Sequence, residues 1–197
     1  MIRISDVFGR ALAAYYRGVK DEHIIERDDG YLDKVNTGIY FREYDDWVEQ
    51  ERRAIQEAEG RILDVGCGVG RVALWLQEQG HDVVGIDVST LALEIAKKRG
   101  VDDCRLMDVR ELDFPEGYFD AIVLFGNNFG LAGGIKQTRQ MLESLYKVTC
   151  KDGIILAATR DPLKTDNPYH LAYHEINRSR GDPGTGENSY RFRRRVW

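Results

Sequence analysis

The sequence predicts an α/β protein with a doubly wound, mostly parallel sheet that is flanked by helices on both faces. Two observations predict this fold. From residue 61 onward, short apolar runs alternate with segments of helical periodicity, a pattern typical of right-handed strand–helix–strand units. A glycine-rich loop separates the first apolar run from the first of these helices, which is where sheets of this kind bind ligands.

Five strands are predicted after residue 60, over residues 62–65, 82–87, 104–107, 119–125 and 154–159. The run over 119–125 is almost continuously apolar, as expected of a strand that is buried on both faces. Helices are predicted over residues 71–79, 90–99 and 136–148, because apolar side chains recur there every three or four residues. Gly80 and Gly100 are the expected ends of the first two helices.

The two ends of the chain look different from this central part. Residues 1–60 are expected to form a helical cap, with helices over 6–18 and 43–58, and residues 61–197 to form the α/β domain. Turn-forming residues stand between the two helices, at 28–30 and 36–38. Near the C-terminus we expect a helix over 169–179, a loop over 181–188 and a strand over 190–197. Because the chain stops on this strand, we favour an incomplete sheet edge, truncated after Trp197, over a genuine terminal strand.

Composition excludes several classes of protein. A chain of 197 residues with 43% apolar residues predicts one domain with a sizeable core, and a net charge of −5 disfavours nucleic acid and anionic membranes as partners. No apolar run approaches the roughly 18 residues of a membrane span, and the first six residues do not resemble a signal peptide. The three cysteines have neither disulfide nor zinc spacing, which fits a reducing cytoplasm.

The stretch Asp64-Val65-Gly66-Cys67-Gly68-Val69-Gly70 carries the most chemical information. Alternate glycines let the backbone approach a ligand closely, and the start of the following helix offers free amide groups. A dinucleotide site needs G-x-G-x-x-G to seat a pyrophosphate, which Asp64 would repel. The spacing G-x-G-x-G with an acid in front therefore favours a cationic, phosphate-free nucleoside ligand over a dinucleotide.

Two further aspartates stand at the carboxyl ends of the next two predicted strands. Asp87 ends the second strand, 17 residues after Gly70, and Asp108 follows the third. A carboxylate at the first place can accept from both ribose hydroxyls, and one at the second can accept from an adenine amine. Each aspartate alone is better explained as a helix cap or loop residue. Three acids at the carboxyl ends of three consecutive strands favour the functional interpretation.

These residues resemble the class I S-adenosylmethionine-dependent methyltransferases over about residues 55–160. Residues 62–71 are similar to the first motif of that family, Asp87 to its ribose-binding acid, Asp108 to its adenine-contacting acid, and residues 119–124 to its fourth-strand motif. The resemblance implies a Rossmann-like sheet of seven strands in the order 3-2-1-4-5-7-6, of which this chain offers five, a candidate sixth and no seventh. It implies that S-adenosylmethionine, and its product S-adenosylhomocysteine, contact Asp64, Val65, Gly66, Cys67, Gly68, Gly70, Arg71, Asp87, Val88, Met107, Asp108, Val109, Phe125 and Gly126.

The same resemblance places the methyl acceptor after the fourth strand, where we expect Asn127, Asn128 and Phe129 to contact it. Methyltransferases that act on base amines carry prolines here, and their absence argues against such a substrate; an asparagine turn without substrate contact explains the residues equally well. Tyr31, Tyr40 and Tyr44 could form an aromatic lid over the cofactor, and Tyr40 and Tyr44 are expected to contact the acceptor as well, although core packing explains these tyrosines better.

Methyl transfer by in-line displacement needs mainly alignment and a dry site, so no general base is assigned. His170 and His174, four residues apart, and Asn127 are the catalytic candidates. A metal is not expected, because no third ligand accompanies the two histidines. Arg191, Arg193, Arg194 and Arg195 invite an RNA-binding hypothesis, but a charged sheet edge explains them equally well.

The predicted function is S-adenosylmethionine-dependent methyl transfer to a small-molecule acceptor in the cytoplasm. The alternatives are a non-catalytic methyltransferase-like binding module, an RNA or protein methyltransferase, and a nucleotide-dependent oxidoreductase.

Overall fold

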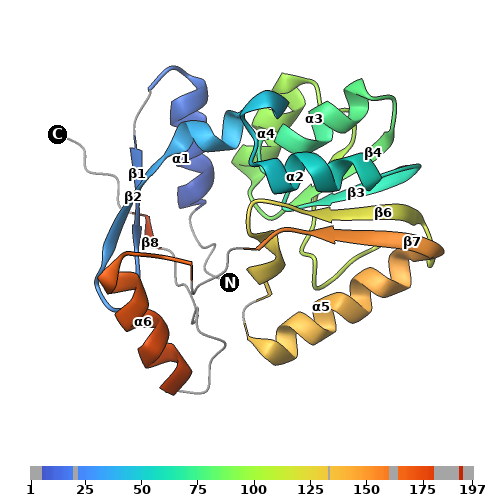
Figure 1. The fold of residues 1–197 in the computed structure, drawn as a ribbon. Coiled ribbons are helices and arrows are strands. Elements are labelled where there is room, and N and C mark those ends of the chain that lie inside the picture. The colour runs from blue at the N-terminus through green and yellow to red at the C-terminus, as the bar shows by residue number, and fades with distance from the viewer. Residues whose placement is uncertain (1–5, 20–21, 133, 160–163, 180–190, 193–197) are drawn as a thin grey trace.

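Five parallel strands form the central sheet, in the order β5-β4-β3-β6-β7 (Figure 1). The computed structural model describes residues 6–19, 22–132, 134–159, 164–179 and 191–192. The strands are β3 (Arg61–Val65), β4 (Asp82–Asp87), β5 (Cys104–Leu106), β6 (Phe119–Leu124) and β7 (Thr149–Ala157). Helices α3 (Arg71–Glu78), α4 (Thr90–Arg99) and α5 (Ile135–Val148) connect them. The predicted mostly parallel sheet is confirmed, and the largest boundary difference is β7, which begins five residues before its predicted start.

Each face of this sheet carries its own apolar core, because successive side chains of a strand point to opposite faces. Ile62 of β3 packs on one face with Ala73 and Leu76 of α3. Leu63, its neighbour, packs on the other face with residues of α5 that include Met141. The alternation fixes the register of β3, so Asp64 falls on the α3 face of the sheet.

The N-terminal region contains helices, as predicted, and also a hairpin that was not predicted. Helix α1 (Val7–Tyr16) precedes strands β1 (Glu22–Glu26) and β2 (Leu32–Asn36), which pair antiparallel. The helix expected over 43–58 is divided into a short turn at Tyr44–Asp46, α2 (Glu49–Ala54) and a turn at Ile55–Glu57. The backbone is extended at Trp47 and Val48, and Trp47 is buried there. The division of the chain at residue 60 stays a prediction.

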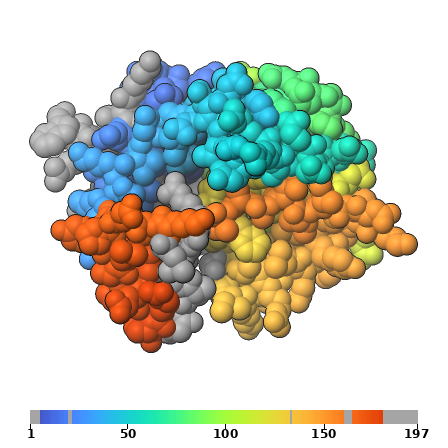
Figure 2. All heavy atoms as spheres, viewed as in Figure 1, coloured from blue at the N-terminus to red at the C-terminus, as the bar shows by residue number. Residues whose placement is uncertain are grey.

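The hairpin is covered by helix α6 (Pro168–Ser179), close to the helix predicted over 169–179 (Figure 1). The guanidinium of Arg27 lies between the rings of Tyr31 and Tyr173, 4.3 and 4.2 Å from their centroids. The hydroxyl of Tyr173 donates to Asp28 over 2.7 Å. Figure 2 shows α6 directly beside the N-terminal elements on the molecular surface.

The C-terminal strand is the point at which the sheet prediction was wrong. Strand β8 (Arg191–Phe192), the described part of the strand predicted over 190–197, pairs antiparallel with β1 and so joins the small sheet β2-β1-β8. It is therefore not the sixth strand of the main sheet, whose described edge strands are β5 and β7. The loop predicted over 181–188, and Arg193, Arg194 and Arg195, lie outside the described residues. Among the helices of the described ranges, none has both the length and the apolar character that crossing a membrane requires.

Candidate active site

The loop after β3 turns back across the end of β4. The amides of Gly66 and Cys67 both donate to the carbonyl of Ile86, and Gly66, Gly68 and Gly70 have φ values of 70°, 54° and 82°. A Cβ on Gly66 would lie 2.5 Å from Nδ2 of Asn128, whereas a Cβ on Gly68 would meet nothing within 4 Å. The loop is thus tightly packed on one side and open at Gly68.

Asp87 joins this loop to the start of α4. Its carboxylate accepts from the amide of Gly68 over 2.9 Å and from the amide of Ser89 over 2.8 Å. Burial raises the pKa of Asp87, and the two amides oppose that rise. The next side chain, Val88, is 69% exposed, so an apolar surface stands free beside the carboxylate.

Asp64 lies on β3, the strand next to β4, in the interior of the protein. Its side chain is buried, and its Oδ2 atom has no hydrogen-bond partner among the described residues. Burial raises the pKa of Asp64 to about 7, against the effects of the Arg71 guanidinium and the amide of Ala73. A buried carboxylate oxygen without a donor is costly, so this position suits a cationic or hydrogen-bond-donating group.

The loop after β6 faces the glycine loop. Asn127 has a φ of 74°, the left-handed backbone expected if these asparagines form a turn without contacting substrate. Its side-chain carbonyl accepts a hydrogen bond from the hydroxyl of Thr159. The side-chain amide of Asn128 donates to the carbonyls of Val65 and Gly66, over 2.8 and 2.9 Å. Asn128 therefore holds the glycine loop in place, and acceptor contact by Asn127, Asn128 and Phe129 stays a prediction.

The residues after β5 lie next to Asp87, because the amide of Met107 donates to the carbonyl of Asp87. Asp108 binds the Arg110 guanidinium, with Nε at 2.9 Å, and this bond lowers the pKa of Asp108. Val109 is buried in the core on the α5 side of the sheet. Adenine contact by Asp108 and cofactor contact by Met107 and Val109 stay predictions, and the burial of Val109 makes it the weakest of the three.

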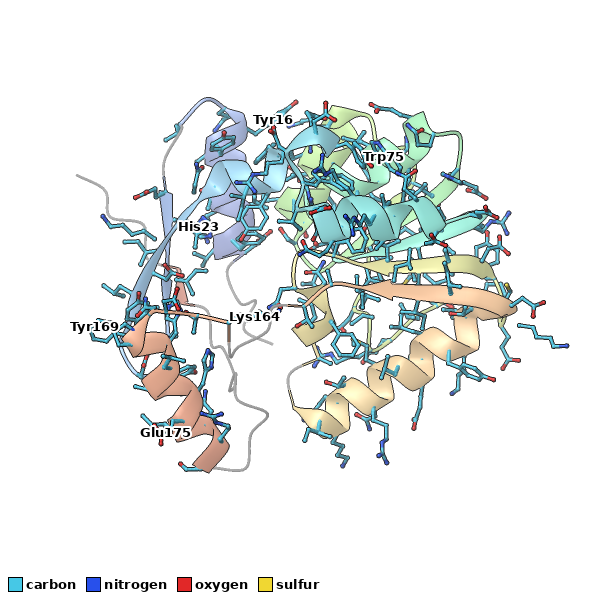
Figure 3. The ribbon with its side chains drawn as sticks, viewed as in Figure 1. Tyr16, His23, Trp75, Lys164, Tyr169 and Glu175 are labelled. Atoms are coloured by element: carbon cyan, nitrogen blue, oxygen red, sulfur yellow. The ribbon has the colours of Figure 1, made fainter. Side chains whose placement is uncertain are left out.

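The tyrosines and histidines from outside the central sheet lie in packing clusters. Tyr44 stacks on Trp75, with ring centroids 4.7 Å apart, and Tyr40 packs edge-on against Phe8. His170 lies edge-on to Tyr31. In Figure 3 Trp75 stands on the opposite side of the view from α6, which carries Tyr169 and Glu175. A covering role for the tyrosines and a catalytic role for His170 or His174 stay predictions.

Two acids near the site were not predicted. Glu51, on α2, binds the Arg71 guanidinium over 2.9 Å and accepts from the amide of Gly126 over 2.8 Å. Asp6 accepts from the hydroxyl of Ser89 and caps α1 at the amide of Gly9. Asp6 is the first residue of the helix expected over 6–18, where an aspartate is a signal for a cap, but no sequence signal separates Glu51 from other helix glutamates.

These residues fit an adenosyl ligand with an ammonium group. Asp64 offers a buried oxygen without a donor, Gly68 leaves open space above its backbone, and Asp87 offers lone pairs beside the exposed Val88. In the described part of the chain, no three His, Cys, Asp or Glu side chains form a group that could hold a metal ion.

Comparison with known proteins points to the same class of protein. A family profile described as "Methyltransferase domain" matches residues 63–157. The crystal structure of an S-adenosylmethionine-dependent methyltransferase from Bacteroides fragilis, in complex with S-adenosyl-L-homocysteine, superposes with a TM-score of 0.69 at 33% identity, covering 76% of this chain and 62% of that one. Residues 63–157 therefore form a methyltransferase domain of the class I, S-adenosylmethionine-dependent kind.

The curated relatives that the chain matches are longer than it is. A putative methyltransferase from Bacillus subtilis, YqeM, is 30% identical over 117 residues, which are 57% of this chain and 47% of that protein. A demethylmenaquinone methyltransferase from Geobacillus kaustophilus is 27% identical over 163 residues, 78% of this chain and 66% of that protein. The chain spans about half to two thirds of the length of these two relatives.

Proposed function

We propose that this domain binds S-adenosylmethionine at the carboxyl ends of β3, β4 and β5 and transfers its methyl group to a small-molecule acceptor. The observation that carries the proposal is the pair of bonds by which Asp87 holds the glycine loop and the start of α4. This bonding presents a carboxylate at the carboxyl edge of the sheet, one strand from the point between β3 and β6 where the strand order reverses, and ligands bind beside that point in sheets of this type.

The chain's own residues would bind and orient the donor. Asp64 would accept from the ammonium group, Asp87 would accept from the ribose hydroxyls, and Val88 would lie against the adenine. When bound, S-adenosylmethionine supplies a methyl group on a sulfonium that is already a good leaving group. The protein's contribution would then be alignment of donor and acceptor in a site that excludes water.

The acceptor is proposed to be a small molecule. Relatives named demethylmenaquinone methyltransferase and ubiquinone biosynthesis O-methyltransferase support a quinone-type ring as the first class to test, and one named glycine/sarcosine N-methyltransferase supports a small amine as the second. We propose the cytoplasm as the site of action, since all three cysteines are free thiols.

Calorimetric titration with S-adenosylhomocysteine, with NADH as the control ligand, tests the donor site. We expect saturable binding of S-adenosylhomocysteine and none of NADH. Tight NADH binding, or no binding of S-adenosylhomocysteine, would contradict the proposal. Incubation with labelled S-adenosylmethionine and a cell extract then separates an enzyme from a binding module, because only an enzyme labels an acceptor.

A further inference from the structure

Glu51 is a buried acid that reaches two loops of the main domain from helix α2. The residue is 6% exposed. One carboxylate oxygen accepts from the Arg71 guanidinium over 2.9 Å, and the other accepts from the amide of Gly126 over 2.8 Å. Arg71 begins α3 directly after the glycine loop, and Gly126 follows β6 at the start of the loop assigned to the acceptor. One side chain therefore connects the two loops that would hold donor and acceptor.

Arg71 is held on a second side as well. Its guanidinium lies over the ring of Trp47, 4.5 Å from the centroid, and its side chain is 15% exposed. The charges of Arg71, Asp87 and Glu51 all act on Asp64. Glu51 thus fixes a cation that faces the carboxylate proposed to receive the ammonium group.

Stability alone is a poor explanation for this arrangement. A buried ion pair contributes little net stability compared with apolar side chains of similar volume, because both charges lose their hydration. Its geometry, however, is well defined when hydrogen bonds satisfy both partners. The Glu51 carboxylate has a hydrogen-bond donor on each oxygen, and the two donors belong to different loops.

We propose that Glu51 is a positioning residue, which sets the spacing between the glycine loop and the acceptor loop through Arg71 and the amide of Gly126. The inference rests on the proposed function, because it takes these two loops as the donor and acceptor sides of one site. Asn128 makes a second link between the two loops: its side chain, on the acceptor loop, donates to the backbone carbonyls of Val65 and Gly66. Removing the Glu51 tie should therefore loosen the site without separating the loops completely.

The variants Glu51→Gln and Glu51→Ala test this, with Glu49→Gln as the matched control. Glu49 lies on the same helix, is exposed and pairs with Arg53. Glu51→Gln keeps an oxygen for the amide of Gly126 but removes the charge that faces Arg71. We expect Glu51→Gln to bind S-adenosylhomocysteine about 10-fold more weakly, the equivalent of one charge-assisted hydrogen bond, and Glu49→Gln to bind like the wild type.

The pH dependence of binding gives a readout that a purely structural role would not move. The charge of Glu51 raises the pKa of Asp64 and the charge of Arg71 lowers it, so removal of the Glu51 charge should shift the midpoint of the binding profile to lower pH in Glu51→Gln. An unchanged affinity together with an unchanged midpoint would overturn the proposal. A weaker affinity with an unchanged midpoint would also overturn it, since that result indicates only a loosened fold.

Amide NMR spectra of the free protein test the positioning without any ligand. We expect Glu51→Ala to move the amide signals of Gly126 and of Gly68 together, and Glu51→Gln serves if Glu51→Ala does not fold. Movement of Gly126 alone would overturn the coupling between the loops. A wild type that fails to bind S-adenosylhomocysteine would overturn the proposed function, while these spectra would still decide whether Glu51 positions both loops.

Discussion

The carboxylate of Asp87 accepts a hydrogen bond from the backbone amide of Gly68, 2.9 Å away. The acid at the end of β4 and the open turn of the glycine loop are therefore held in one arrangement before any ligand arrives. Preorganisation of this kind reduces the entropy that a ligand loses on binding. It also makes Asp87 the most direct test of the donor site.

Replacing Asp87 by alanine should lower the affinity for S-adenosylhomocysteine by at least about 100-fold, because each hydrogen bond to a charged group contributes about 1.5–3 kcal/mol. Calorimetry measures this change. Asp82→Ala is the control, since Asp82 begins the same strand and pairs with Arg61 on the surface. Equal affinities of the Asp87→Ala and wild-type proteins would show that the ribose lies elsewhere.

Protonation of Asp64 should make stability depend on pH. The pKa of this carboxyl is about 7 in the folded protein against 3.8 in the reference state, so the folded state binds more protons between these values. The free energy of unfolding should then fall as pH rises from about 4 to about 7. The Asp64→Asn variant has no carboxyl at this position, so its free energy of unfolding should not fall in this way. Relative to the wild type, its stability should increase by about 2–3 kcal/mol between pH 5 and pH 7, at about 1.4 kcal/mol for each pH unit.

Urea unfolding at a series of pH values measures this difference, with Asp82→Asn as the control for loss of an exposed carboxylate. A parallel pH dependence of Asp64→Asn and wild type would contradict the raised pKa. Binding gives a second readout. If the ligand ammonium meets ionised Asp64, binding at pH 6 releases a proton, and the calorimetric enthalpy changes with the ionisation enthalpy of the buffer.

Alanine substitutions at Gly66 and Gly30 distinguish the cost of a left-handed backbone from the cost of steric overlap. Both have a positive φ, of 70° and 82°, but a Cβ on Gly66 would overlap Asn128, whereas a Cβ on Gly30 meets open space. Gly30→Ala should cost about 1 kcal/mol of stability for the left-handed backbone, and Gly66→Ala about 1–3 kcal/mol more for the overlap. Thermal unfolding compares the two, and similar losses would mean that Asn128 moves away freely.

His170→Ala distinguishes packing from catalysis. His170 contacts the hydroxyl of Thr165 at 3.3 Å and the ring of Tyr31 at 5.4 Å between centroids. We expect a stability loss of about 1 kcal/mol with unchanged affinity for S-adenosylhomocysteine. Loss of methyl transfer without loss of stability would instead support His170 as a catalytic base.

The strands of the main sheet were predictable because their signal is strong and local. Strand β6 is buried on both faces, and its almost continuous apolar run is typical of a central strand of a parallel sheet. The hairpin was missed for the opposite reason. Strand β2 is Leu32-Asp33-Lys34-Val35-Asn36, in which no residue is buried, so its pairing with β1 and the cover from α6 determine its structure more than its own composition does.

The site shows the same division. The places of Asp64 and Asp87 in the fold were predictable, because Asp64 lies in the last two residues of a recognisable strand and Asp87 ends the next one, and the carboxyl ends of parallel strands meet at one edge of a sheet. Glu51 was not, because its partners Arg71 and Gly126 lie 20 and 75 residues away in the sequence. A glutamate on a short helix has the same sequence appearance whether it faces water or a buried guanidinium.

Asn128 links the two halves of the site in a way that limits how substrate specificity can be redesigned. Its side-chain amide belongs to the loop after β6, the proposed acceptor loop, yet its two hydrogen bonds go to the backbone carbonyls of Val65 and Gly66 at the end of β3. Transplanting an acceptor loop from a relative would remove a support of the donor loop unless a side-chain amide is kept at position 128. A chimera without it would fail at donor binding, before its new acceptor preference could be seen.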